Sequence, residues 1–274
     1  MSILNTILRT VFDTLLLPFR DLPALVGLAV VSLATSAFLL VVFKRTSNQK
    51  ALDAVKRQIH ASLFEIRLFN DDFRTILRAQ AEILRHNMRY LRYSSVPMLW
   101  MLPPLVLVIA QLQFHYGYEG LAVGQSALLK VFLEPATHSQ EKPRVSVEAP
   151  VGLEFTSASV WIPTSGEMTW RIEARSPGIY EVRIAQANDS VTKTIIVAKG
   201  VLRRSPLRIR GFWNELLYPA EPPLPAESSI RSVAVTYPGA EISVFGIGVH
   251  WMIVYSLLSI VFAFVLKGPF RVVI

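Results

Sequence analysis

Residues 44–113 decide the fold, because a basic segment with helical periodicity leads without a linker into an apolar run. The segment begins KRTSNQKALDAVKRQIH at residues 44–60, and the run reads VPMLWMLPPLVLVIAQLQ at residues 96–113. Residues 44–94 carry eleven Lys or Arg against five Asp or Glu. A transmembrane helix with a basic cytoplasmic approach has this pattern. We therefore expect a transmembrane helix at 95–116 and a cytoplasmic segment at 44–94.

Two further stretches have the composition of membrane spans. Residues 22–43 carry no charge and end at Lys44 and Arg45, and residues 247–266 end at Lys267. The chain of 274 residues is 52% hydrophobic and has no cysteine. These features predict an integral membrane α-helical protein with three transmembrane helices and a cytoplasmic tail at 267–274. Without cysteine, an exported part has no disulfides, which favours a bacterial inner membrane.

The distribution of charge predicts the topology. The net charge of +8 lies in residues 44–94 and in the tail, whereas residues 1–21 and 114–246 are neutral. Because cytoplasmic loops carry the excess of Lys and Arg, we expect the N-terminus and residues 114–246 outside, in the periplasm, and the C-terminus inside. This pattern does not predict nucleic-acid binding. The expected partners are membrane lipids and other membrane proteins, as clients or as complex subunits.

Two segments that flank the first span have amphipathic helical patterns. Residues 1–21 place apolar side chains on one face and Asn5, Arg9 and Asp13 on the other, which predicts a helix on the outer membrane surface. Residues 44–94 repeat apolar side chains every three to four positions, which predicts a coiled-coil hairpin of two antiparallel helices. We expect its turn at 70–72, where Asn and Asp favour turns. The stripe of the second helix comprises Phe73, Ile76, Leu77, Leu84, Met88 and Leu91.

Residues 142–246 change to the alternation of β-strands. Six short strands are expected at 145–148, 152–155, 160–162, 168–174, 179–184 and 191–197, with two more at 232–236 and 241–245. This spacing predicts an all-β, immunoglobulin-like sandwich on the exterior, with Trp161 and Trp170 in its core. Residues 117–141 are expected to form an exterior loop, followed at 127–132 by a short helix or an interfacial segment.

The predicted spans contain few polar side chains. Ser32, Thr35 and Ser36 lie on one face of the first span, and either pack closely against another helix or form the wall of a polar groove. Gln111 lies near the outer end of the second span, either at headgroup level or in a polar recess. Pro103 and Pro104 should kink that span. Ser256 and Ser259 are polar positions of the third.

The order of these elements resembles the YidC/Oxa/Alb-type membrane-protein insertases and their three-span relatives. The local similarity runs from Arg85-His86-Asn87 through Val96-Pro97-Met98-Leu99 to Leu102-Pro103. The resemblance implies an insertase-like or chaperone-like factor whose client segment enters a groove between the spans. It places polar groove contacts at Ser32, Thr35, Ser36, Gln111, Ser256 and Ser259. It assigns the first basic contacts with the client to Arg85, Arg89 and Arg92 of the hairpin.

An alternative is a structural or accessory subunit of a larger membrane complex, whose exterior sandwich binds a partner. The sequence predicts no enzyme, because it has no phosphate loop, no nucleophile elbow and no histidines at metal-ligand spacing. Catalytic residues, cofactors and metal sites are therefore not expected.

Overall fold

The computed structural model describes residues 2–68, 73–134, 142–186, 189–211, 214 and 217–272. The chain divides into two compact units. The β unit comprises Met1–Leu28 and Leu107–Val254, and the helical unit comprises Ala29–Val106 and Tyr255–Ile274. Within the described residues, three helices are long and apolar enough to cross a membrane: Ala24–Thr46, Ile76–Tyr116 and Trp251–Phe270. They confirm the three apolar helices expected from the sequence.

In the helical unit, α2 (Ala24–Thr46) packs against α6 (Trp251–Phe270). Ser36 Oγ donates to Ser259 O at 3.0 Å, and Lys44 Nζ donates to Phe270 O at 2.8 Å. The second contact lies closer than the first to the C-terminal end of both helices, so α2 and α6 run parallel. Near Lys44, a cluster of Leu40, Phe43, Leu52 and Val272 joins this pair to the start of α3.

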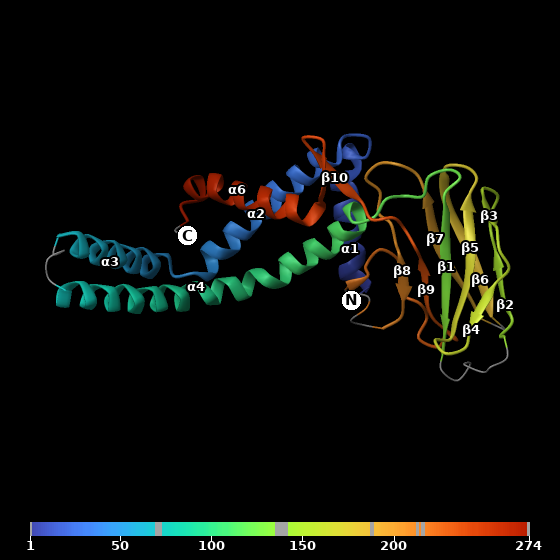
Figure 1. Ribbon diagram of the computed structural model, residues 1–274, viewed down its shortest axis with the longest axis horizontal. Coiled ribbons are helices and arrows are strands. Elements are labelled where there is room, and N and C mark those ends of the chain that lie inside the picture. Colours follow the sequence, from blue (N-terminus) through green and yellow to red (C-terminus); the bar gives the residue numbers. More distant parts are fainter. Residues whose placement is uncertain are drawn as a thin grey trace. The chain divides into compact units, whose positions relative to one another are not determined.

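The hairpin consists of α3 (Gln49–Leu68) and α4 (Phe73–Tyr116), which lie side by side in Figure 1. The expected turn at 70–72 lies outside the described residues. Helix α4 is one helix of 44 residues that continues through Pro97, Pro103 and Pro104, so the hairpin arm and the second span are a single element. In α3 the expected apolar stripe is confirmed at Leu52 and Val55, which are buried, and is wrong at Leu63, which is exposed.

Most of the expected stripe of α4 is exposed, although its member Ile76 is half-buried. Leu77, Leu84, Met88 and Leu91 are exposed, whereas Ala79 is buried and Ile83, His86 and Tyr90 are half-buried. The two sets lie about 140° apart around the helix, because each residue advances the direction of its side chain by 100°. Apolar side chains therefore occupy two faces of α4, of which one is the inner face of the hairpin.

The β unit contains two main antiparallel sheets that share one core (Figure 1). The first has the order β3-β5-β1-β9-β8, with β4 also paired to β5, and the second has the order β2-β6-β7. The strands of the first sheet are β1 (Ser126–Leu133), β3 (Leu153–Phe155), β4 (Val160–Ile162), β5 (Glu167–Ala174), β8 (Leu207–Ile209) and β9 (Ile230–Val235). The strands of the second sheet are β2 (Val145–Glu148), β6 (Gly178–Gln186) and β7 (Asp189–Val197). Buried side chains from both sheets, such as Leu129 and Ile184, fill the core, as expected of a sandwich.

Strand β1 corrects the expectation of a loop and short helix at 117–141. It lies between β5 and β9, and Leu129 stands opposite both Trp170 and Val235. Its run ALLKVFL is apolar on both faces, which hides the alternation that marks a strand, because one face lies in the core and the other is half-buried. The six expected strands between 145 and 197 and the two after 230 are confirmed to within two residues.

The third apolar helix begins later than expected. Residues 247–250 form strand β11 (Ile247–His250), which pairs with β10 (Glu241–Val244) through the two-residue turn Phe245-Gly246. Both turn residues have positive φ, 51° and 84°, which is the geometry of a type I′ turn. Helix α6 then runs to Phe270, so residues 267–270 of the expected tail at 267–274 are helical.

Helix α1 (Ser2–Leu16) presents its polar side to the β unit. Asn5, Phe12 and Leu16 are buried, and Arg9 and Asp13 lie on the same face, whereas Ile7 and Val11 are exposed. The 3-10 turn η1 (Leu17–Phe19) follows, and Arg20 O then accepts a hydrogen bond from Val201 N at 3.2 Å. The outward face of α1 is mixed, because Thr6, Thr10 and Thr14 are exposed beside Ile7 and Val11.

Candidate functional site

The polar residues of α2 lie inside the packing of the helical unit. Ser32, Thr35 and Ser36 are all buried, and they continue a buried stripe that runs from Gly27 and Leu28 through Val31 to Leu40 and Phe43. Ser36 is bonded to α6, and the hydroxyl of Tyr255 lies within reach of the side chains of Thr35 and Ser259. Of the two alternatives for these residues, this arrangement favours close helix packing through small side chains.

The other expected groove residues do not complete one polar wall. Ser259 is half-buried at the α2–α6 contact, whereas Ser256 is exposed. Gln111 belongs to the β unit, where it is buried, and its Oε1 has no hydrogen-bond partner among the described residues. The main-chain carbonyl oxygen of Gln111 contacts His115 Nδ1 at 3.0 Å. The structure therefore brings together Ser32, Thr35, Ser36 and Ser259, and leaves Ser256 at the surface.

Helix α4 carries an exposed row of apolar side chains, here called the apolar row. It follows heptad positions, spaced by three, four or seven residues along one face of the helix. Its large members are exposed by about half or more of their surface: Leu77, Leu84, Met88, Leu91, Met98 and Leu102. Because α4 is unbroken, the row runs from the hairpin arm into the apolar part of the helix. The spacing of these apolar residues is visible in the sequence, but the sequence analysis predicts one apolar stripe on this helix, whereas the structure has two.

The basic residues expected to contact clients lie beside the apolar row. Arg85, Arg89 and Arg92 are exposed, and with Arg78 they form the basic row, about 80–140° from the centre of the apolar row around α4. The three predicted arginines therefore share one face of the helix. An apolar row with a cationic border can hold an apolar helix that carries acidic residues at its edge.

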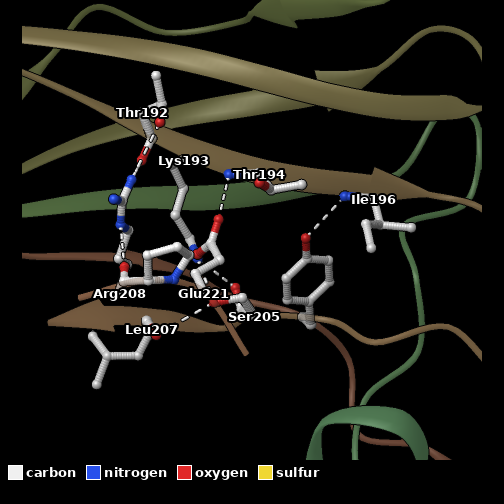
Figure 2. Close-up of polar contacts among 10 residues, drawn as sticks. Thr192, Lys193, Thr194, Ile196, Ser205, Leu207, Arg208 and Glu221 are labelled. Atoms are coloured by element: carbon white, nitrogen blue, oxygen red, sulfur yellow. Dashed lines mark hydrogen bonds and ion pairs between the residues drawn. The ribbon is translucent and has the colours of Figure 1, made fainter. Parts of the chain in front are cut away.

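In the β unit, the buried polar groups centre on Lys193 of β7. The ammonium group is fully buried and donates to Glu221 Oε2, to Ser205 O at 2.7 Å and to Ser205 Oγ at 2.8 Å (Figure 2). Glu221 Oε1 accepts the backbone N–H of Thr194 at 2.7 Å. Burial raises the pKa of Glu221, but the charge and hydrogen bond of Lys193 lower it more, so the net shift is downward. Every donor of the ammonium group is satisfied within the protein, which indicates a structural role for Lys193.

A second polar cluster joins α1 to the end of α4 and to the loop after β7. Asp13 Oδ1 contacts His115 Nε2 at 3.2 Å, and Asp13 Oδ2 accepts Arg203 Nη2 at 2.7 Å. Burial raises the pKa of Asp13, and the hydrogen bond to His115 with the charges of Arg203 and Arg20 lowers it to below its ordinary value. Next to it, Arg204 is buried and donates to four carbonyl oxygens, those of Tyr118, Ala198, Gly200 and Leu202. Sequence reasoning missed both arginines, because neither belongs to a motif.

No group of three or more metal-ligating side chains occurs in the part of the chain that the structure describes. Comparisons of the chain with protein-family models, with curated proteins and with solved structures gave no match.

Proposed function

We propose that the protein is an insertase-like or chaperone-like factor for membrane-protein biogenesis. In this proposal, the apolar row of α4 contacts the apolar segment of a client, and the basic row contacts acidic residues beside that segment. The single observation that carries the proposal is the continuity of the apolar row from Leu77 to Leu102 on one unbroken helix. A client segment on this row passes from the hairpin to the apolar part of α4 along one face of the helix, which the polar side chains of Gln80 and Ser95 interrupt.

The proposal includes a membrane topology. The N-terminus and the β unit lie on the exterior of a bacterial inner membrane, and the hairpin and the C-terminus lie in the cytoplasm, as the distribution of Lys and Arg favours. The β unit is an exterior, immunoglobulin-like sandwich in this proposal. The chain lacks cysteine, so single cysteines introduced at Gln80 and Ser157 report the two sides directly. A membrane-impermeant thiol reagent added to intact cells should label the Ser157→Cys variant and leave Gln80→Cys unlabelled; labelling of Gln80→Cys would reject the topology.

Site-specific photo-crosslinking tests the client contact. A photoreactive residue is placed at Leu84 or Met88 of the apolar row, and, as a matched control, at Tyr93, which is exposed on another face of α4. During translation of a membrane protein in the presence of the factor, the two row positions should trap nascent apolar segments and the control should not. Equal crosslinking at Tyr93, or crosslinks to one fixed protein only, would contradict the proposal.

A second candidate function is an accessory subunit of a membrane complex, and the packing of α2 against α6 favours it. Ser32, Thr35 and Ser36 are buried in that contact, so the polar face expected to receive a client is closed. In this case a partner subunit covers the apolar row permanently. Purification of the full-length protein in mild detergent distinguishes the two functions, because a subunit retains a stoichiometric partner and an insertase-like factor does not.

A further inference from the structure

Strands β10 and β11 form a two-stranded sheet of their own, here called the β-finger, outside the two main sheets (Figure 1). Side chains alternate between the two faces of a strand and paired residues share a face, so the register divides the β-finger into two sides. One side carries only polar or small residues: Glu241, Ser243, Gly248 and His250. The other side carries only apolar residues: Ile242, Val244, Ile247 and Val249. The β-finger is therefore amphipathic.

The protein covers the apolar side of the β-finger at its base and leaves it open toward the turn. Ile242 is buried, and Val244 and Val249 are half-buried. Ile247 is 68% exposed, and Phe245 in the turn is completely exposed. A two-stranded hairpin alone is barely stable in water and needs a surface that covers its apolar side. Among the described residues nothing covers Phe245, which leaves this side chain for another surface.

The turn holds Phe245 in an unfavourable backbone conformation. Its φ is +51°, which bulky side chains rarely adopt, and a type I′ turn prefers Asn at this position. The exposed phenyl ring does not stabilise the core of the β unit, so the fold gives no reason for this residue. Backbone strain that the fold does not need indicates a role in binding.

Hydrogen bonds hold the base of the β-finger at the end of α4. Ala240 N, just before β10, donates to Gly117 O at 3.2 Å. Trp251 Nε1, just after β11, donates to Gln113 Oε1 at 3.2 Å. Helix α6 begins at Trp251, so two of the three apolar helices meet at this base.

The third apolar helix begins at the same place. Ala24, the first residue of α2, lines one cavity with Ile242, and both belong to the β unit. The base of the β-finger therefore lies where all three apolar helices begin or end, which is the level of a membrane surface if they span. A strand rises about 3.3 Å per residue, so Phe245 lies within about 13 Å of this base.

We propose that the β-finger lies in the outer surface of the membrane, with Phe245 and Ile247 among the lipid acyl chains and its polar side toward water. Its partner is the lipid bilayer, because amphipathic elements beside membrane helices bury their apolar side at this level. The inference rests on the proposed membrane location of the three apolar helices, and not on the handling of clients. The β-finger then attaches the β unit to the membrane beside the helices.

A fluorophore on a single cysteine tests the lipid contact, because the chain has no cysteine of its own. The full-length protein, labelled through Ile247→Cys, is placed in phosphatidylcholine nanodiscs with and without a lipid that carries a nitroxide quencher on its acyl chain. We expect the nitroxide to remove at least about half of the fluorescence. The matched control is Val160→Cys, exposed on β4 and apart from the β-finger in Figure 1. It should lose less than about one tenth, since a site in water does not meet acyl chains.

A label at Leu257→Cys, exposed on α6, tests the membrane location separately. Quenching at Leu257 without quenching at Ile247 would overturn the β-finger proposal and leave the location of the helices intact. Quenching at neither position would overturn both. A blue-shifted emission at Ile247 without quenching would show that protein, and not lipid, covers the β-finger, which also overturns the proposal.

Phe245→Asn, made in the Ile247→Cys protein, separates lipid contact from folding. In detergent this variant should unfold within about 3 °C of its parent, because Asn suits the positive φ of the turn. In nanodiscs the quenching at Ile247 should fall by at least about half, because the apolar end of the β-finger is lost. A much lower Tm would assign Phe245 to the fold, and unchanged quenching would show that Phe245 does not hold the β-finger in lipid. Either result would overturn the proposal.

Discussion

The ammonium group of Lys193 is completely buried and donates to a carboxylate oxygen of Glu221, which comes from a loop 28 residues further along the chain. This pair joins β7 to the loop after β8, and Ser205 supplies the two remaining acceptors. Removing one member of a buried ion pair leaves an uncompensated charge in the protein interior. Loss of either partner should therefore destabilise the β unit.

We expect Glu221→Gln and Lys193→Met each to lower the stability of the β unit by about 3–5 kcal/mol, because each leaves one buried charge unpaired. The double variant Lys193→Met/Glu221→Gln should lose less than the sum of the two. Thermal unfolding of the four full-length proteins in one detergent gives this double-mutant cycle. Additive losses would show that the two residues do not act as a pair.

Acid should destabilise the β unit through three carboxyl groups whose pKa values lie below their ordinary values. Burial raises the pKa of Asp13, Glu167 and Glu221, but hydrogen bonds and charges of His115, Lys130 and Lys193, respectively, lower it more. The unfolded chain then binds more protons than the folded one at acid pH. The stability from these groups is complete above the unfolded pKa of about 4 and is lost as pH falls through the lower folded values.

The Tm of the full-length protein should therefore change little between about pH 7 and pH 5 and fall steeply below about pH 4. The Asp13→Asn variant should show a smaller fall than the wild type, because one of the three groups no longer titrates. Glu227→Gln is the control, since Glu227 is exposed. Identical acid profiles for Asp13→Asn and the wild type would contradict the contribution of Asp13.

The sequence predicted the positions of the helices and strands better than the contacts between them. The apolar spans and eight strands follow from local periodicity, which is a property of short segments. Strand β1 was missed because its run ALLKVFL is apolar on both faces, and the direction of Leu84 and Met88 was missed because α4 has apolar side chains on two faces. The partners of Arg203 and Lys193 are 190 and 28 residues away in sequence, so only the fold brings them together.

Gly200 should not tolerate alanine, because two constraints meet there. Its φ is +91°, and a Cβ would lie 2.6 Å from the carbonyl oxygen of Arg20. Gly124 is a matched control, since its φ is +83° and nothing lies within 4 Å of its Cβ position. We expect Gly124→Ala to cost about 1–2 kcal/mol for the backbone conformation and Gly200→Ala about 3 kcal/mol or more. Equal shifts of Tm would show that the segment at Arg20 moves away from the added methyl group.

The packing of α2 against α6 predicts opposite results for two serines. Ser36 is 3% exposed and donates to Ser259 O, whereas Ser256 is exposed on α6. Leucine at Ser36 would force the helices apart and remove the hydrogen bond, so Ser36→Leu should cost about 1–3 kcal/mol. Ser256→Leu should change stability by less than about 0.5 kcal/mol. Thermal unfolding in detergent, followed by protease resistance of the helical unit, measures both. If Ser36→Leu were as stable as the wild type, the α2–α6 contact would be open, and the polar face of Ser32, Thr35 and Ser36 would again be available to a client.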